Sequence, residues 1–125
     1  MEYKNISLLN RALDATNMRQ ETVSSNIANV NTPGYKAKRV EFESVLQQAM
    51  DGTGLRKTNE RHFGVSGHND VTAKIKAQEG NRVGENGNNV AIDTEMAELA
   101  ANSIHYQALV SQTSAQYNML RSVLR

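Results

Sequence analysis

The 125-residue sequence contains no cysteine, no tryptophan and a single proline, Pro33. The lack of cysteine excludes disulfides, thiolate catalysis and the common zinc sites, while it leaves the redox compartment open. No apolar run reaches the ~18 residues that a membrane-spanning helix needs, so we expect no direct membrane span. The first residues also lack the charged start and continuous apolar core of a secretory signal. We therefore expect a cytoplasmic protein, or one exported without a cleaved signal peptide.

Aromatic residues make up only 5% of the chain and hydrophobic residues 38%, which is a small supply for a large globular core. Charged residues make up 22% and nearly cancel, for a net charge of +1. The chain has neither a basic stripe nor alternating aromatic and arginine residues, so we expect no nucleic-acid partner. Its length fits one domain, or one domain with helical extensions.

What the sequence does have is an apolar rhythm at each end. Residues step by three and four, a mean spacing of about 3.5 that keeps one stripe of a helix facing a partner helix. We call these two stripes the main seams. Their apolar members are Ile6, Leu9, Leu13, Val23, Ile27 and Val30 near the start, and Met96, Leu99, Tyr106, Val110, Tyr117, Leu120 and Leu124 near the end. Polar residues interrupt the seams at Thr16, Gln20, Ser103 and Thr113, which weakens a coil but fixes its register.

A second stripe, the alanine seam, lies one residue round from the main seam of the last helix. Its members are Ala97, Ala101, Ile104, Ala108, Ser111 and Ala115. Leu8, Ala12 and Ala15 lie in the same way beside the main seam of the first helix. One helical hairpin cannot cover two seams on each helix, so burial within one chain and burial between chains both stay open. We expect helix ends that become ordered only on assembly.

These patterns predict a mainly α-helical fold in which long N- and C-terminal helices form an antiparallel coiled-coil pair. The assigned regions are residues 1–31 for the N-terminal helix, 32–51 for a turn and a short helix, 52–89 for a flexible loop and strand region, and 90–125 for the C-terminal helix. Pro33 and Gly34 suit the centre of a type II turn. The short helix is expected at about 41–50, and the alternation at 71–78 predicts a half-buried strand.

The charged and histidine residues indicate no active site. His62 and His68 lie six residues apart, a spacing that suits neither one helix face nor one strand face. Asp93 is a natural N-cap, and Glu95 and Glu98 are explained as charges at a helix start rather than as a catalytic pair. We expect no enzyme activity, no metal and no cofactor.

Two segments resemble the bacterial flagellar rod and hook family. Residues 24–36, SSNIANVNTPGYK, are similar to the N-terminal signature of flagellar axial proteins, where the first helix ends in a turn. Residues 87–102, GNNVAIDTEMAELAAN, are similar to the C-terminal part of a proximal rod subunit. The matching signature residues are Asn26, Asn29, Thr32, Pro33, Gly34 and Tyr35.

The resemblance implies a structural subunit of the proximal rod of the flagellar basal body, in the periplasmic or cell-wall region. Subunits of this family pack their terminal helices into a tube that transmits torque for motility. The implied partners are copies of itself, other rod subunits, basal-body ring or adaptor proteins and the flagellar type III export apparatus. A cytoplasmic coiled-coil adaptor or export chaperone is the alternative.

Overall fold

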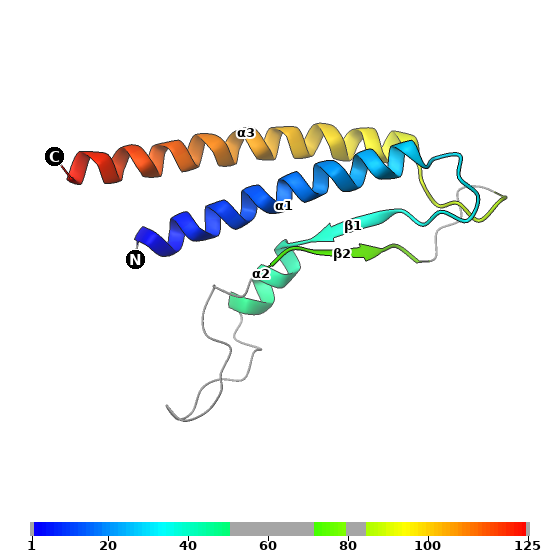
Figure 1. The fold of residues 1–125 in the computed structure, drawn as a ribbon, viewed down its shortest axis with the longest axis horizontal. Coiled ribbons are helices and arrows are strands. Elements are labelled where there is room, and N and C mark those ends of the chain that lie inside the picture. Colours follow the sequence, from blue (N-terminus) through cyan, green and yellow to red (C-terminus); the bar gives the residue numbers. More distant parts are fainter. Residues whose placement is uncertain (1, 51–71, 80–84, 125) are drawn as a thin grey trace, which may run out of the picture.

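The computed structural model describes residues 2–50, 72–79 and 85–124 of the chain. Its elements run in the order α1 (Glu2–Ala28), β1 (Lys38–Glu41), α2 (Glu43–Met50), β2 (Lys74–Ala77) and α3 (Ile92–Val123). α1 and α3 lie side by side as an antiparallel pair, while the sheet and α2 lie on the side of α1 away from α3 (Figure 1). This arrangement confirms the expected fold of two long terminal helices with a small β-containing middle.

The end of α1 leads directly into the expected turn. Val30 N–H donates a hydrogen bond to Ile27 O at 3.2 Å, an i→i−3 bond that tightens the end of the helix. Tyr35 N–H then donates to Thr32 O at 3.2 Å, and Gly34 has a φ of +71°. A type II turn requires positive φ at its third residue, which L side chains rarely adopt, so this turn needs its glycine.

α3 begins without a side-chain cap. Ala91 is the N-cap in extended conformation, and Glu95 N–H donates to Ala91 O at 3.0 Å. The expectation of an N-cap at Asp93 is therefore wrong by two residues. Asp93 lies instead in the first turn, where its negative charge favours the positive end of the helix dipole.

The sheet has two antiparallel strands, with Val40 of β1 opposite Ile75 of β2. Val40 is buried because β1 packs on α1. All four residues of β2 are exposed, including Ile75 at 53%, so the expectation of a half-buried strand is wrong. The alternating sequence indicated the strand correctly, but α1 covers only the neighbouring strand.

The hydrophobic core is small and lies between α1 and the middle elements. Ala15 and Phe42 are its buried centre, and the partly buried residues packed on them are Leu8, Ala12, Val45, Leu46 and Ala73. The stripe of Leu8, Ala12 and Ala15 is thus covered within the chain. Among the described residues, as many polar as apolar side chains are buried, so hydrogen bonds hold much of the interior together.

Candidate assembly surface: a polar junction and an exposed helix

A cluster of polar side chains joins the two long helices at the end where α3 begins. We call it the polar junction; its members are Asn26, Arg39, Asn88, Asn89 and Glu95. Arg39 is partly buried and the other four are buried. The junction brings together the segments 24–36 and 87–102, which are far apart in the sequence and meet at one end of the molecule (Figure 1).

Asn26 is the centre of the junction and is fully buried. Its Nδ2 donates to Lys38 O and its Oδ1 accepts from Lys38 N–H, both at 2.9 Å. Nδ2 also donates to Glu95 Oε2 at 3.0 Å. One amide therefore joins α1 to β1 and to α3, and its bonds replace the water that burial removes.

Glu95 and Arg39 form a bidentate ion pair across the junction. Arg39 Nη2 donates to Glu95 Oε1 at 2.6 Å and Nη1 donates to Oε2 at 2.9 Å. Hydrogen bonding to Glu95 raises the pKa of the Arg39 guanidinium above its ordinary value, and this outweighs the opposite effect of burial. The carboxylate of Glu95 thus has a permanently charged partner, which a charge with no exposed surface requires.

Asn88 and Asn89 attach the chain before α3 to the end of α1 and to the sheet. Asn88 Nδ2 donates to Asn29 O at 2.9 Å and to Thr32 O at 2.7 Å, so it ties the chain before α3 to the turn that follows α1. Asn89 Oδ1 accepts from Ala37 N–H at 2.6 Å, and its Nδ2 donates to Gln78 O. Both side chains lie in the region expected to be a flexible loop, yet both are buried and fixed by hydrogen bonds.

The family-signature residues lie in or beside this junction. The Tyr35 hydroxyl donates to Asn26 Oδ1 at 3.3 Å, and Asn29 Nδ2 donates back to Ser25 O at 2.8 Å. Pro33 and Gly34 form the exposed turn that separates α1 from β1. Their position agrees with a role in shaping the chain as it leaves α1, which stays a proposal.

Sequence reasoning missed the functional part of Arg39, Asn88 and Asn89. It also misread the role of Glu95. Glu95 has the position of a helix-start charge, but it points into the junction and is not solvated. The available signal was the number of asparagines in both segments, because this side chain donates and accepts at the same time. The predicted antiparallel pair places the two segments at the same end of the hairpin, but nothing in the spacing showed which side chains would bond there.

α3 is the least covered element. Only Glu95 and Asn102 of this helix are buried, and both lie in its first third. Along the α3 main seam, Leu99 and Leu120 are partly buried, and the exposed members are Met96, Tyr106, Val110, Tyr117 and Leu124. Along the α1 main seam, Ile6 and Val23 are buried, and the partly buried members are Leu9, Leu13, Ile27 and Val30. The hairpin thus buries one side of α1 but leaves most of α3 open.

The alanine seam is exposed along its whole length. Large apolar residues outside this seam, such as Tyr117 and Met119, are also exposed on the same helix. A helix with apolar residues around its circumference is normally buried on several sides. The exposed α3 is therefore the candidate assembly surface of this chain.

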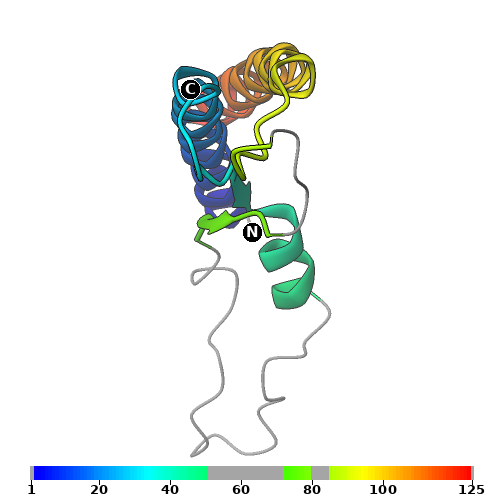
Figure 2. The same ribbon diagram turned by 90° about the vertical axis from the view of Figure 1, so that its right-hand side faces the viewer.

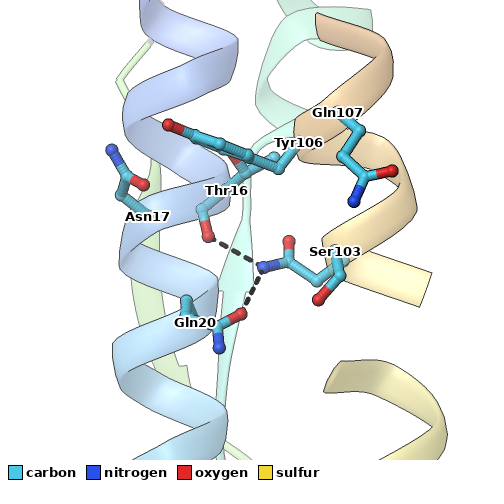
Figure 3. Close-up of a pocket in the computed structure, with 7 residues that line it drawn as sticks. Thr16, Asn17, Gln20, Ser103, Tyr106 and Gln107 are labelled. Atoms are coloured by element: carbon cyan, nitrogen blue, oxygen red, sulfur yellow. Dashed lines mark hydrogen bonds between the residues drawn. The ribbon is translucent and has the colours of Figure 1, made fainter. Parts of the chain in front are cut away.

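Of the four polar interruptions in the seams, three do not act across the helix pair. The hydroxyls of Thr16, Ser103 and Thr113 each donate to a carbonyl of their own helix, at Leu13, Leu99 and Leu109. Gln20 does act across the pair, because Asn102 Nδ2 of α3 donates to Gln20 Oε1 at 3.2 Å and to Thr16 O at 3.0 Å (Figure 3). A hydroxyl three or four residues past a carbonyl can always reach it, which removes the need for a partner.

Within the described ranges, no three His, Cys, Asp or Glu residues lie close enough together to hold a metal ion. His62 and His68 lie outside the described residues. None of the helices in those ranges contains an apolar stretch long enough to cross a membrane.

Comparison with known proteins agrees with the two signature segments. The family model described as flagella basal body rod protein matches residues 8–36. The flagellar basal body rod protein FlgB of Bacillus subtilis is 41% identical over 119 residues, which cover 95% of this chain and 92% of that protein. The proteins of the same name from Escherichia coli and Proteus mirabilis are 33% and 32% identical over 121 residues, covering 91% of this chain and 88% of each relative. The chain belongs to the FlgB family of flagellar basal body rod proteins.

Proposed function

We propose that this chain is a structural subunit of the proximal rod of the flagellar basal body and that it assembles through its terminal helices. The relatives reported above are all named as basal body rod proteins, which gives the adaptor or chaperone alternative no support. Packed side by side, such helices would form a stiff shaft able to transmit torque. We propose that the chain performs no catalysis.

The single observation that carries this proposal is the contrast between the two ends of α3. Its start is held to α1 and β1 by the polar junction, while residues 103–124 have no buried member. The junction gives each subunit a defined hairpin, and the rest of α3 remains available to neighbours. A helix 32 residues long spans about 48 Å, so this surface is large enough for more than one neighbour.

The setting of the assembled rod is part of the proposal. We infer a position in the periplasmic or cell-wall region and export through the flagellar type III apparatus without a cleaved signal peptide. Copies of the chain, other rod subunits and basal-body ring or adaptor proteins are the proposed partners. The small core supports this route, because a chain with few buried apolar residues is easily held unfolded for export.

Val110→Asp tests the proposed surface. Val110 is 40% exposed, so the carboxylate would stay hydrated in the free subunit and the fold should survive. In an assembled rod the same charge would be buried without a partner, at a cost of several kcal/mol. We expect cells that carry the variant to make normal amounts of the protein but to be non-motile. Their basal bodies should lack every part that assembles after this subunit.

Thr94→Asp is the matched control, because it adds the same charge to an exposed position in the first turn of the same helix. There the helix dipole favours a negative charge. Normal swimming by Val110→Asp would contradict the proposal, whereas loss of motility in both variants would point to a general intolerance of charge on α3.

A further inference from the structure

Asn86 and Gly87 form the only Asn–Gly pair in the sequence, and they lie in the turn before α3. In such a pair the backbone nitrogen of the glycine can attack the side-chain amide carbon of the asparagine, because glycine has no side chain to shield that nitrogen. Asn86 is exposed, and Gly87 has a φ of +79°. The turn therefore places a nucleophile next to an electrophile at a position that water can reach.

The side-chain carbonyl of Asn86 is polarised by a neighbouring amide. Asn88 N–H donates to Asn86 Oδ1 at 3.3 Å, which folds the side chain back over the peptide bond to Gly87 as an Asx turn. If Gly87 N attacks Asn86 Cγ, negative charge develops on Oδ1. A donor that already points at this oxygen stabilises the developing charge, as the donors of an oxyanion hole do.

A second hydrogen bond favours the nucleophile. Gly34 N–H donates to Asn86 O at 3.0 Å. This oxygen belongs to the same peptide group as Gly87 N, so it shares the negative charge when that nitrogen loses its proton. Hydrogen bonding to a charged form favours that form. The turn that follows α1 thus activates the turn that precedes α3.

We propose that Asn86 is a site of spontaneous deamidation in the folded subunit. Hydroxide removes the proton of Gly87 N–H, and Gly87 N forms a bond to Asn86 Cγ. The bond between Cγ and Nδ2 breaks, and Nδ2 takes a proton from water and leaves as ammonia. Water then opens the five-membered imide at either carbonyl, which gives aspartate or isoaspartate at position 86. This modification goes beyond the proposed function and does not depend on it.

The modified residue would lie directly before two members of the polar junction, Asn88 and Asn89. Isoaspartate adds one carbon to the main chain between positions 86 and 87. Asn88 is fixed to the carbonyls of Asn29 and Thr32, so the extra carbon has to be accommodated within this turn. We expect the start of α3 to be held less firmly in the modified chain, with faster amide hydrogen exchange at residues 92–98.

The test incubates the purified full chain at mildly alkaline pH, once in its native state and once unfolded in urea. Mass spectrometry of the peptides measures the replacement of the Asn86 amide by a hydroxyl, and chromatography separates aspartate from isoaspartate. We expect the native chain to react about fivefold faster than the unfolded chain, because the bonds from Asn88 and Gly34 exist only in the fold.

Asn31 is the control within the same molecule. It is exposed at the same end of the hairpin, but Thr32 N–H donates to Asn29 O at 3.0 Å and a branched side chain shields its nitrogen. We expect Asn31 to stay unmodified while Asn86 reacts. Gly87→Asn is the matched variant, because asparagine tolerates a positive φ and a Cβ at this position comes no closer than 3.9 Å to Gly34 Cα. The added side chain should slow the reaction of Asn86 roughly tenfold.

The outcomes decide the proposal without touching the rod assignment, since the measurement needs no assembly. If Asn86 reacts no faster in the native chain than in urea, the fold does not activate the pair and the proposal is overturned. Equal rates at Asn31 and Asn86 would also overturn it, because exposure alone would then explain the reaction. Both comparisons use the unaltered chain, so they hold even if Gly87→Asn fails to fold.

Discussion

Asn26 acts on Lys38 as a neighbouring strand acts in a sheet, because its amide pairs with both the N–H and the C=O of that residue. The same amide also donates to the carboxylate of Glu95. Only asparagine offers a donor and an acceptor at this length, since aspartate lacks the donor and leucine lacks both. At the scale of single residues, the fold therefore depends on buried polar groups that cannot form hydrogen bonds with water if their partners in the protein are lost.

Asn26→Asp is expected to lower the free energy of unfolding by about 3 kcal/mol or more. The substitution removes the donor to Lys38 O and places a second carboxylate beside that of Glu95, in a site with no exposed surface. Urea denaturation followed by circular dichroism measures the change.

Asn29→Asp is the matched control, because it makes the same chemical change just after the end of α1. Asn29 Nδ2 donates only to Ser25 O and the residue is partly exposed, so we expect a loss of about 1 kcal/mol. Glu95→Gln should recover part of the loss in Asn26→Asp. If Asn26→Asp and Asn29→Asp lower the free energy of unfolding equally, the polar junction contributes no more to stability than the partly exposed end of the helix does.

At the scale of elements, α2 is held against α1 by Val45 and Leu46, which pack on the core of Ala15 and Phe42, and by one ion pair. Arg19 Nη2 donates to both carboxylate oxygens of Glu43, at 2.9 Å and 2.8 Å. Burial alone would raise the pKa of Glu43, but the hydrogen bonds from Arg19 and from the backbone at Glu43 and Phe42 lower it below its ordinary value of 4.5. This pair therefore makes the attachment of α2 dependent on pH.

The sign follows from the lowered pKa. The unfolded chain binds a proton at Glu43 more readily than the folded chain, so the stability from this pair is present above about pH 4.5 and is lost as the pH falls through the folded pKa. Because the Glu43 side chain is 66% exposed, the contribution is at most about 1 kcal/mol. Glu43→Gln should thus lower stability at pH 7 and have little effect at pH 3, measured by urea denaturation at both values.

Arg19→Met provides the background for this measurement. Without the guanidinium, Glu43→Gln should no longer cost stability at pH 7, because burial then disfavours the charged form. An equal effect of Glu43→Gln at both pH values would mean that the loss comes from packing and not from the ion pair.

At the scale of the whole molecule, the two ends of the helical hairpin are held together to different degrees. One end of the hairpin is held by the polar junction, and the two helices separate toward the start of α1 and the end of α3 (Figure 1). The view turned by 90° shows the sheet and α2 below the helix pair, away from α3 (Figure 2). The middle elements thus cover α1 and leave α3 largely exposed.

Amide hydrogen exchange of the isolated subunit should show this gradient. Residues 92–102 of α3 are held by the buried side chains of Glu95 and Asn102, whereas residues 103–123 have no buried side chain and only a few partly buried ones, such as Leu109 and Leu120. Tertiary packing provides most helix stability, so the second segment has less support. We expect exchange at least tenfold faster in the second segment, and slower exchange there in purified basal bodies. Uniform protection of α3 in the isolated subunit would mean that the helix needs no neighbour.

Much of the fold was predictable from local pattern. Residues spaced by three and four indicated both long helices, and the alternation at 71–78 indicated a strand. Pro33 and Gly34 predicted the turn that the structure contains. These features depend on backbone preference and on periodicity, which act between residues that are near in sequence.

The polar junction was not predictable in the same way. Arg39 and Glu95 are 56 residues apart, and each alone has the character of an ordinary surface charge. Asn102 sits among alanines and gave no sign that it, and not Thr16 or Ser103, would bond across the helix pair.

The sequence by itself determined that two long helices would form, where the first would end, and that their seams held more apolar surface than one hairpin could bury. Only the tertiary structure decided which seam is covered within the chain, and it is that of α1, because the core of Phe42 and the strand β1 lie on that side. It also decided that Glu95 is buried and Val110 exposed. The physical reason is that burial depends on which distant segments meet in space. Periodicity along one helix shows which of its sides is apolar, but not which segment covers that side.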